Sequence, residues 1–313
     1  MFSNNCSLGS VSGTSPPNFP NRTDVTLESM SVTPLLVSRM IAKLDSNISP
    51  GPDCIPSVIL KILSPELSSI LAKLFNKCLK ECTFPNTWRC ATIVPAFKNC
   101  GDRTDPNKYR PISLLPIISK IFESIINNKI SGHLESLCLL TDKQYGFRRS
   151  RSTADLLTVI TERIFRALDR CGETKSVALD ISKAFDRVWH QGLLQKIQSY
   201  GISGQVFSVV KSFLSNRKIN VVLDGQRSGN YSISSGVPQG SILGPTLFLI
   251  YINALPDNLI CDLVIYADDT TLYSCLNDES LPEQRLALAK SLECDLATVS
   301  NWGNTWQVTL GEN

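Results

Sequence analysis

The sequence predicts an α+β or mixed α/β fold in which strands alternate with helices. Short runs rich in β-branched residues, typical of strands, lie between longer segments whose apolar residues recur every three to four positions, as on one face of a helix. Of the 313 residues, 42% are hydrophobic, so the chain can bury a sizeable core. Elements that alternate in this way pack as layers around a common core.

Helices are predicted in the segments that show helical apolar periodicity. The first begins behind Thr33 and Pro34, because proline suits the first turn of a helix. Ser64 and Pro65 should interrupt the second, which we interpret as scaffold, since proline disfavours helical geometry in the residue before it. A turn at residues 109–111 precedes the third. The predicted helices span residues 35–44, 56–80, 112–130, 152–168, 192–200, 205–214, 245–254 and 281–298.

Strands are predicted in short runs of apolar and β-branched residues that turn residues bound on both sides. They span residues 92–97, 176–179, 220–223, 232–234 and 263–266. Residues 1–30, by contrast, are rich in Ser, Asn, Pro and Thr and show no apolar periodicity, so we expect a tail or linker there.

The composition says more about the cellular compartment of the protein than about its binding partner. The net charge is only +3, which does not by itself indicate a nucleic-acid ligand, although local basic clusters can still neutralise phosphates. The longest apolar stretches, such as residues 243–252, are shorter than the roughly 20 residues of a membrane-spanning helix. No basic segment followed by an apolar one, the pattern of a secretory signal, begins the chain. We therefore expect an intracellular protein of the nucleus or cytoplasm, without a membrane partner.

The cysteines show no metal-binding or disulfide pattern. The chain has 11 of them, an odd number, without CxxC pairs and without the histidine spacing of zinc sites. We interpret them as reduced thiols of an intracellular protein, most of them buried.

Two segments place acids where strands end. Residues 177–186 carry Asp180 directly after an apolar strand, and a carboxylate buried there without a partner is costly, so it should meet solvent, a cation or a metal. Residues 264–273 contain an apolar run, the adjacent acids Asp268 and Asp269, and a second β-prone run. This order predicts a hairpin with the acids at its tip. By itself, such an acidic pair is an ordinary turn.

These acids would form a metal centre if the hairpin lay beside the strand that ends at Asp180. Asp180 and Asp268 would then converge, whereas strand alternation turns Asp269 partly away unless the tight turn brings it back. Clustered carboxylates repel one another, and hard oxygen ligands with room for water suit Mg²⁺, which takes substrate phosphates as its remaining ligands. Two such ions, about 3.5–4 Å apart, stabilise both the attacking and the leaving oxygen of a phosphoryl transfer.

Six segments, in order along the chain, resemble the sequence boxes of reverse transcriptases, and in particular those of non-LTR, LINE-type retrotransposons. The last three resemble the family's first catalytic box, its PQGS box and its YADD box. An unrelated two-metal phosphohydrolase would not carry the second and fifth segments. The six are SPGPD at 49–53, YRPISL at 109–114, QYGFR at 144–148, LDISKAFD at 179–186, GVPQGSILGP at 236–245 and YADD at 266–269.

The resemblance implies an RNA-directed DNA polymerase that adds deoxynucleotides to a primer 3′-hydroxyl. Asp180, Asp268 and Asp269 would be its catalytic residues and the ligands of Mg²⁺, with Mn²⁺ as a substitute. Its partners would be an RNA template, a DNA primer and deoxynucleoside triphosphates, and the protein would act as a monomer. The alternative is a catalytically incompetent remnant that at most binds RNA or a protein partner. The three intact carboxylates favour the enzyme.

The resemblance also implies a fold: the fingers and palm of a right-hand polymerase, with an antiparallel palm sheet backed by helices. The tail would span residues 1–30, a fingers-like region 31–172, and the catalytic palm 173–313. Residues 301–308 resemble the approach to the next palm box, but the chain ends before that box's lysine and before a thumb. We therefore expect a truncated reading frame of a mobile element that binds a primer-template duplex weakly.

Four residues match family positions that contact the incoming nucleotide. Phe185 matches the bulky gate against a ribose 2′-hydroxyl, because an aromatic face leaves that hydroxyl neither room nor a partner. Packing in the core is the other interpretation of Phe185. Lys98 and Arg110 match the cationic clamp on the triphosphate, or else they are solvated surface charges. Gln239 matches the residue that lies under the nucleotide.

Two further groups match positions that contact the template and primer. Gly236, Pro238 and Gly240 belong to the box beside the nascent base pair, where glycine lets the backbone approach closely, although a structural turn explains the glycines equally well. The densest basic cluster is assigned to template phosphate, through electrostatics rather than base reading, with a solvated basic turn as the alternative. This cluster comprises Arg148, Arg149 and Arg151.

Overall fold

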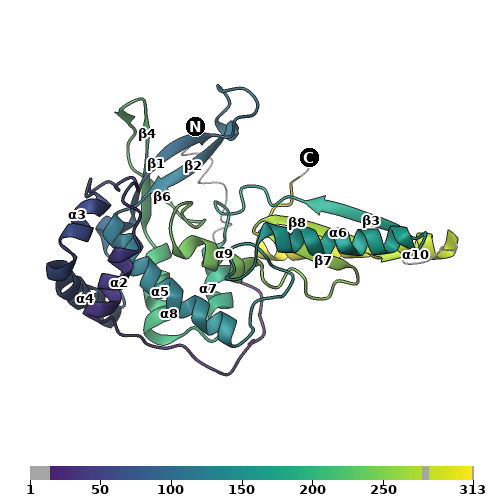
Figure 1. Ribbon diagram of the computed structural model, residues 1–313, viewed down its shortest axis with the longest axis horizontal. Coiled ribbons are helices and arrows are strands. Elements are labelled where there is room, and N and C mark those ends of the chain that lie inside the picture. Colours follow the sequence, from purple (N-terminus) through teal and green to yellow (C-terminus); the bar gives the residue numbers. More distant parts are fainter. Residues whose placement is uncertain (1–14, 277–281, 312–313) are drawn as a thin grey trace. The chain divides into compact units, whose positions relative to one another are not determined.

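The structure is a computed structural model that describes residues 15–276 and 282–311 (Figure 1). Its elements confirm the predicted alternation of strands and helices. Of the described residues, one compact unit holds those up to Leu139 together with Phe185–Phe248, and a second holds Leu140–Ala184 together with those from Leu249 onward. Each unit combines two separate stretches of chain. Helix α6 (Thr153–Asp169), for example, packs on strands that follow it in the sequence, so this grouping cuts across the expected boundary at residue 172.

The N-terminal helices begin and end where the sequence predicts. Helix α2 (Pro34–Ala42) starts behind Thr33, whose Oγ1 accepts a hydrogen bond from the backbone N–H of Leu36 at 3.2 Å. The second helical region is interrupted as expected: α3 (Ser57–Ile62) and α4 (Ser64–Lys80) are separate helices. Proline near the start of α4 accounts for the break.

The chain from residue 15 to α2 contains no helix, as expected of a linker, yet its backbone is hydrogen-bonded to the first unit. The N–H of Leu27 donates to the carbonyl of Gly201 at 2.7 Å, and the N–H of Ser203 donates to the carbonyl of Leu27 at 3.1 Å. The amide of Asn76 binds both backbone groups of Val32, accepting from its N–H at 2.9 Å and donating to its carbonyl at 2.8 Å. The linker is therefore held in place over much of its length.

The first unit contains a five-stranded sheet in the order β2-β1-β4-β5, with β6 also paired to β4. Strands β1 and β4 are parallel, and the other neighbours are antiparallel. The strands are β1 (Cys90–Phe97), β2 (Tyr109–Leu114), β4 (Arg217–Leu223), β5 (Gln226–Arg227) and β6 (Tyr231–Ile233).

The prediction of a turn at residues 109–111 and a helix from residue 112 is wrong. These residues form β2, which pairs with β1 from Phe97 opposite Tyr109 to Thr92 opposite Leu114. β2 is an edge strand, so its outer side has no neighbouring strand. Pro111, which has no N–H to donate, therefore removes no inter-strand hydrogen bond on that side. Helix α5 (Ile117–Ser136) begins only afterwards.

Aromatic rings fill the core of the first unit. Phe122 on α5 is fully buried and stacks on Phe75 and Phe84, with ring centroids 4.8 Å and 5.7 Å apart, and it meets Trp88 edge-on at 6.1 Å. Phe84 in turn contacts Phe213 at 5.1 Å. Phe213 belongs to α8 (Gly204–Leu214) and Trp88 to the short 3-10 helix η1 (Asn86–Arg89), and α7 (His190–Ser199) packs against α8.

The second unit is built on a three-stranded antiparallel sheet in the order β3-β8-β7. Its strands are β3 (Glu173–Leu179), β7 (Asp262–Tyr266) and β8 (Asp269–Leu276). Helices α6 and α10 (Pro282–Trp306) lie along this sheet (Figure 1). Helix α9 (Leu243–Ile252) leads into the unit from the preceding stretch. The predicted hairpin and the helices that back an antiparallel sheet are therefore present.

Most described cysteines are not buried, contrary to the prediction. All ten are free thiols, but only Cys78 is buried and five are exposed. Cys82, Cys138 and Cys171 follow the ends of α4, α5 and α6 with left-handed φ angles of 53°, 50° and 58°. Such positions end a helix in a surface turn, and this explains why none of the three is buried. Among the described helices, none combines the length and apolar character needed to cross a membrane.

We predict that Phe122→Ala lowers the free energy of unfolding by about 3–5 kcal/mol, because it leaves a cavity among stacked rings. Phe165→Ala is the matched control, since that ring is 62% exposed, and it should cost less than about 1 kcal/mol. Urea denaturation of both variants measures the difference. Equal losses would show that the aromatic cluster is not a well-packed core.

Candidate active site

A two-residue turn in the second unit carries the adjacent acids. Strands β7 and β8 pair up to Tyr266 opposite Asp269, so Ala267 and Asp268 form the turn. Ala267 has a left-handed φ of 58°, which residues with a side chain seldom adopt. The prediction of a hairpin with acids at its tip is confirmed.

Asp180 stands at the same end of this sheet. Strand β3 pairs with β8 as far as Leu179 opposite Thr270, so Asp180 directly follows this last pair on one side and Asp269 directly precedes it on the other. On its other side, Asp269 pairs with Tyr266 of β7. The three acids therefore gather at one end of one sheet. The convergence of Asp180 with Asp268 stays a prediction.

The three carboxylates suit a divalent cation in their chemistry. Asp180 and Asp269 are exposed and Asp268 is half-buried, which leaves room for water. Carboxylate oxygens with accessible water are the ligands that Mg²⁺ prefers. In the part of the chain that the structure describes, no three acidic, histidine or cysteine side chains are grouped closely enough to hold a metal ion. The sheet thus supplies suitable oxygen donors at one end, but their side chains are not already grouped as a metal-binding site.

Residues near the end of the described chain fix the backbone around Asp180. Ile181 and Leu310 form an antiparallel bridge, and the N–H of Gly311 donates to the carbonyl of Asp180 at 2.7 Å. A Cβ added at Gly311 would lie 3.2 Å from the carboxylate Oδ2 of Asp180. Glycine at this position therefore leaves room for the carboxylate.

A segment to which the sequence assigns no catalytic role lies along the other side of the hairpin. The N–H of Tyr145 donates to the carbonyl of Ile265 at 2.8 Å, and the N–H of Ile265 donates to the carbonyl of Lys143 at 2.9 Å. A Cβ added at Gly146 would approach the backbone nitrogen of Ala267 to 2.3 Å, so only glycine fits here. The signal that could have identified the segment is this glycine within the QYGFR box.

The basic cluster is largely engaged within its own loop. The Nη1 of Arg148 donates to the carbonyl of Thr141 at 2.8 Å, and its side chain is only 7% exposed. Arg151 pairs with Asp142, with 2.6 Å between Nη2 and Oδ1. Arg149 is exposed. Two of the three arginines therefore stabilise the loop, and Arg149 is the cluster's exposed cation.

In the first unit, two of the residues matched to the nucleotide, Phe185 and Gln239, lie at one loop, residues 236–241. The carbonyl of Phe185 accepts from the N–H of Val237 at 2.7 Å, and the Nε2 of Gln239 donates to the Oδ1 of Asp186 at 3.1 Å. The ring of Phe185 stacks on Phe248, with 4.7 Å between centroids. This stacking is the packing contact that the alternative interpretation of Phe185 expects, and it leaves the gate role a proposal.

Glycines let this loop pass close to its neighbours. Gly236 and Gly240 have left-handed φ angles of 84° and 104°. An added Cβ would lie 2.6 Å from the carbonyl oxygen of Asp186 at Gly236, and 2.8 Å from that of Ser113 at Gly240. Next to them, the carbonyl of Pro238 accepts from the N–H of Ser241 at 3.1 Å. The structural-turn interpretation of the two glycines is therefore sufficient to explain them.

Buried polar groups that sequence reasoning missed hold the loop's far end. Glu123 on α5 is fully buried, and its Oε2 accepts from the N–H groups of Ile242 and Leu243 at 2.8 Å and 3.4 Å. These N–H groups stand at the start of α9, where a carboxylate is favourable. Burial raises the pKa of Glu123, whereas the charge of Arg217 lowers it. No periodic pattern marks Glu123, because it lies within an apolar helix.

Arg217 and His190 are the other polar groups packed near this loop. Burial lowers the pKa of Arg217 to about 10, so it stays protonated at neutral pH, and its buried Nη2 has no hydrogen-bond partner among the residues that the structure describes. Arg217 lines a small pocket together with Asp186 and Gln239. Burial also lowers the pKa of His190, and its neutral Nε2–H donates to the carbonyl of Gly236 at 2.7 Å.

Lys98 and Arg110 lie on the hairpin of β1 and β2. Arg110 pairs with Ala96, and the N–H of Lys98 donates to the carbonyl of Lys108 at 2.8 Å, so both cations lie near the loop that connects the two strands. Both are exposed, and the Nζ of Lys98 also donates to the carbonyl of Asn107 at 3.1 Å. The structure therefore places them together but leaves the clamp and surface-charge interpretations open.

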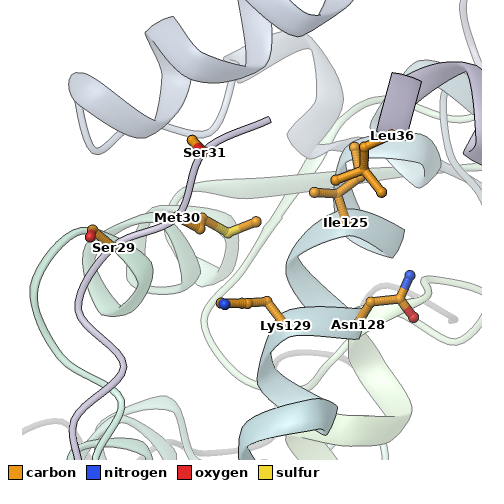
Figure 2. Close-up of a pocket in the computed structure, with 7 residues that line it drawn as sticks. All are labelled: Ser29, Met30, Ser31, Leu36, Ile125, Asn128 and Lys129. Atoms are coloured by element: carbon orange, nitrogen blue, oxygen red, sulfur yellow. The ribbon is translucent and has the colours of Figure 1, made fainter. Parts of the chain in front are cut away.

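Figure 2 shows another pocket of the first unit, where the segment before α2 passes over α5. None of the described residues that line it is one that the sequence assigns to metal, nucleotide or template. The pocket therefore shares no lining residue with the candidate site. Its lining comprises Ser29, Met30, Ser31, Leu36, Ile125, Asn128 and Lys129.

Comparisons with known proteins agree with the sequence boxes. Residues 98–313 match the family model for reverse transcriptase (RNA-dependent DNA polymerase). The chain is 34% identical over 282 residues to the RNA-directed DNA polymerase from mobile element jockey of Drosophila melanogaster, covering 88% of this chain and 30% of that protein. It is 32% identical to the probable RNA-directed DNA polymerases from transposon BS and transposon X-element of the same organism, covering 89% and 90% of this chain and 31% of each relative. The chain thus spans less than a third of the length of these curated relatives.

We predict that Gly236→Ala destabilises the protein more than Gly225→Ala does. Both glycines have similar left-handed φ angles, 84° and 76°, but a Cβ at Gly225 would meet open space. Gly225→Ala should therefore cost about 1 kcal/mol from backbone strain alone. Gly236→Ala should cost about 3 kcal/mol, because its Cβ also collides with the carbonyl of Asp186. Chemical denaturation compares the two, and similar costs would argue against the close approach.

Proposed function

The chain belongs to the reverse transcriptase (RNA-dependent DNA polymerase) family, and on that premise we propose that it adds deoxynucleotides to a primer 3′-hydroxyl with RNA as the template. The observation that carries the proposal is the register of β3, β8 and β7. It brings Asp180, Asp268 and Asp269 to one end of one sheet. Three carboxylates gathered there suit phosphoryl transfer, in which charge must be stabilised on entering and leaving oxygens.

In this proposal the three carboxylates hold divalent cations. Mg²⁺ is the metal that fits hard oxygen donors with accessible water, and Mn²⁺ would substitute for it. When bound, the metal supplies positive charge to the triphosphate and to the primer 3′-oxygen. Asp180, Asp268 and Asp269 would supply carboxylate oxygens to the cations from the end of β3, the turn and the start of β8. The protein's own part is to hold these carboxylates at the sheet's end.

The first unit would bind the incoming nucleotide. Lys98 and Arg110, exposed on one hairpin, would neutralise its triphosphate, because cationic donors bind phosphate oxygens strongly. Gln239 would lie under the nucleotide, with its side chain oriented by Asp186. The ring of Phe185, supported by Phe248, would block a ribose 2′-hydroxyl.

The template and primer would be held mainly through their phosphates. Arg149 is the exposed cation for this role, while Arg148 and Arg151 would support its loop. The segment of Gly236, Pro238 and Gly240 would lie beside the nascent base pair. We propose residues 31–172 as fingers and residues 173–313 as palm, and a monomer as the acting species. The substrates in this proposal are an RNA template, a DNA primer and deoxynucleoside triphosphates.

We predict that Asp268→Ala lowers primer extension on an RNA template by at least about 100-fold, because a charge that acts on the transferring phosphoryl group is lost. The control is Asp262→Asn, which removes an acid of the same hairpin that pairs with Lys143 and Arg163. That control should keep most of the activity. Equal extension by the parent chain and the Asp268→Ala variant would refute the catalytic role, and the remnant that only binds RNA would then be the better hypothesis.

We predict that Phe185→Val admits ribonucleotides. The smaller side chain should reduce the ratio of deoxynucleotide to ribonucleotide incorporation by about 10- to 100-fold, a factor typical of steric discrimination by the wall of a pocket. Phe248→Leu is the control, because it removes the ring on which Phe185 stacks and leaves Phe185 itself in place. Single-nucleotide incorporation measured with paired dNTP and rNTP substrates gives the ratio. An unchanged ratio in Phe185→Val would assign the ring to core packing.

A further inference from the structure

The side-chain amide of Gln144 binds the turn that carries Asp268. Gln144 is 2% exposed, its Oε1 accepts from the N–H of Ala267 at 3.0 Å, and its Nε2 donates to the carbonyl of Ala267 at 3.3 Å. A backbone N–H only donates and a backbone carbonyl only accepts, so these partners determine which end of the amide is the oxygen. One side chain thus satisfies both backbone polar groups of Ala267.

The amide is itself held in place by local structure. Its Oε1 accepts a second hydrogen bond from the N–H of Gly146 at 2.8 Å. The backbone of Gln144 forms a parallel bridge with Ile265. Ile265 is the last residue but one of β7, the strand that leads into the turn. Rotating the amide away would leave three buried hydrogen bonds unmade, and unmade buried hydrogen bonds are costly.

Ala267 needs such support because of its conformation. Its φ of 58° lies in the left-handed region, which is unfavourable for a residue with a Cβ. A residue keeps such a conformation where several surrounding contacts hold it there. Gly146 contributes by leaving space for the backbone of Ala267. If the amide were removed, Ala267 could relax, and the direction of the next residue, Asp268, would change with it.

We infer that Gln144 is a positioning residue for the proposed polymerase reaction: by holding Ala267 in its left-handed conformation, it sets the direction in which Asp268 presents its carboxylate to a divalent cation. This inference rests on the proposed function of Asp268. Gln144 acts through the backbone of the turn. Supporting groups of this kind around metal ligands commonly influence metal affinity or activity by about 10- to 100-fold.

The chain offers a matched control for this contact. Asn76 makes the same pair of hydrogen bonds, from one side-chain amide to the N–H and carbonyl of one residue, Val32. Both of these bonds hold the linker before α2, which carries none of the proposed site residues. Gln144→Met and Asn76→Leu each replace the amide by an apolar chain of similar length. Comparing the two variants separates the general effect of losing such a pair of hydrogen bonds from the specific effect of losing the pair at Ala267.

The first experiment measures amide hydrogen exchange in the metal-free chain. Gln144→Met should speed exchange at Ala267 and its neighbours by at least about 10-fold, because local opening of the turn becomes easier. Asn76→Leu should speed exchange around Val32 and leave the hairpin unchanged. Unchanged exchange at Ala267 in Gln144→Met, or the same increase there in Asn76→Leu, would overturn the inference.

A second variant covers the case in which Gln144→Met does not fold. Gln144→Glu keeps an oxygen that accepts from Ala267 and Gly146, but its carboxylate has no N–H to donate to the carbonyl of Ala267 and repels that carbonyl instead. Faster exchange at Ala267 is expected in this variant as well. Exchange equal to that of the parent chain would contradict the positioning role.

The second experiment titrates Mn²⁺ into each chain and follows the free ion by electron paramagnetic resonance. Gln144→Met should bind Mn²⁺ about 10- to 100-fold more weakly than the parent, whereas Asn76→Leu should bind it equally well. If the parent and its Asp268→Ala variant bind Mn²⁺ alike, the proposed function of the acids fails, and the exchange result still decides whether Gln144 holds the turn. If Asp268→Ala weakens binding and Gln144→Met does not, the positioning role alone is refuted.

Discussion

The antiparallel register of β3, β8 and β7 is the constraint on which the candidate site depends. It places Asp180 directly after the end of β3 and Asp269 at the start of the neighbouring β8, and it leaves Asp268 in the turn between β7 and β8. Because side chains alternate along a strand, a slip of one residue would send the acid of one strand to the opposite face. The three carboxylates repel one another, so a stable register is needed to keep them together. Pairing of seven residues between β3 and β8 provides it.

The second unit also shows how a tight turn is held in an unfavourable conformation. Ala267 is left-handed, Gly146 leaves space for it, and the amide of Gln144 satisfies its backbone. The first unit uses a related device at residues 236–241, where glycines allow close passage and buried Glu123 binds the start of α9. Buried polar groups of this kind add little to stability, because their desolvation offsets their interactions. Their effect is to favour one arrangement of a loop over others.

Local patterns predicted much of the secondary structure. Helical periodicity marked α2 and α6, proline marked the break between α3 and α4, and the order of apolar runs and acids marked the hairpin of β7 and β8. The failures have physical causes. Residues 112–114 were expected to begin a helix but form part of β2, because pairing with β1 outweighs local preference. The cysteines were expected inside, yet three of them end helices in surface turns.

The sequence by itself determined the family, the identity of the acids and their place at strand ends, because these follow from residue types at short spacing. Tertiary structure alone decided that Asp180 and Asp269 flank the last pair of β3 and β8, since a register is a property of paired strands. It also decided that Arg148 and Arg151 bind their own loop, and that Gln144 supports Ala267. The register and the contact of Gln144 depend on hydrogen bonds between segments that are distant in the sequence, and such contacts leave no periodic trace in the chain.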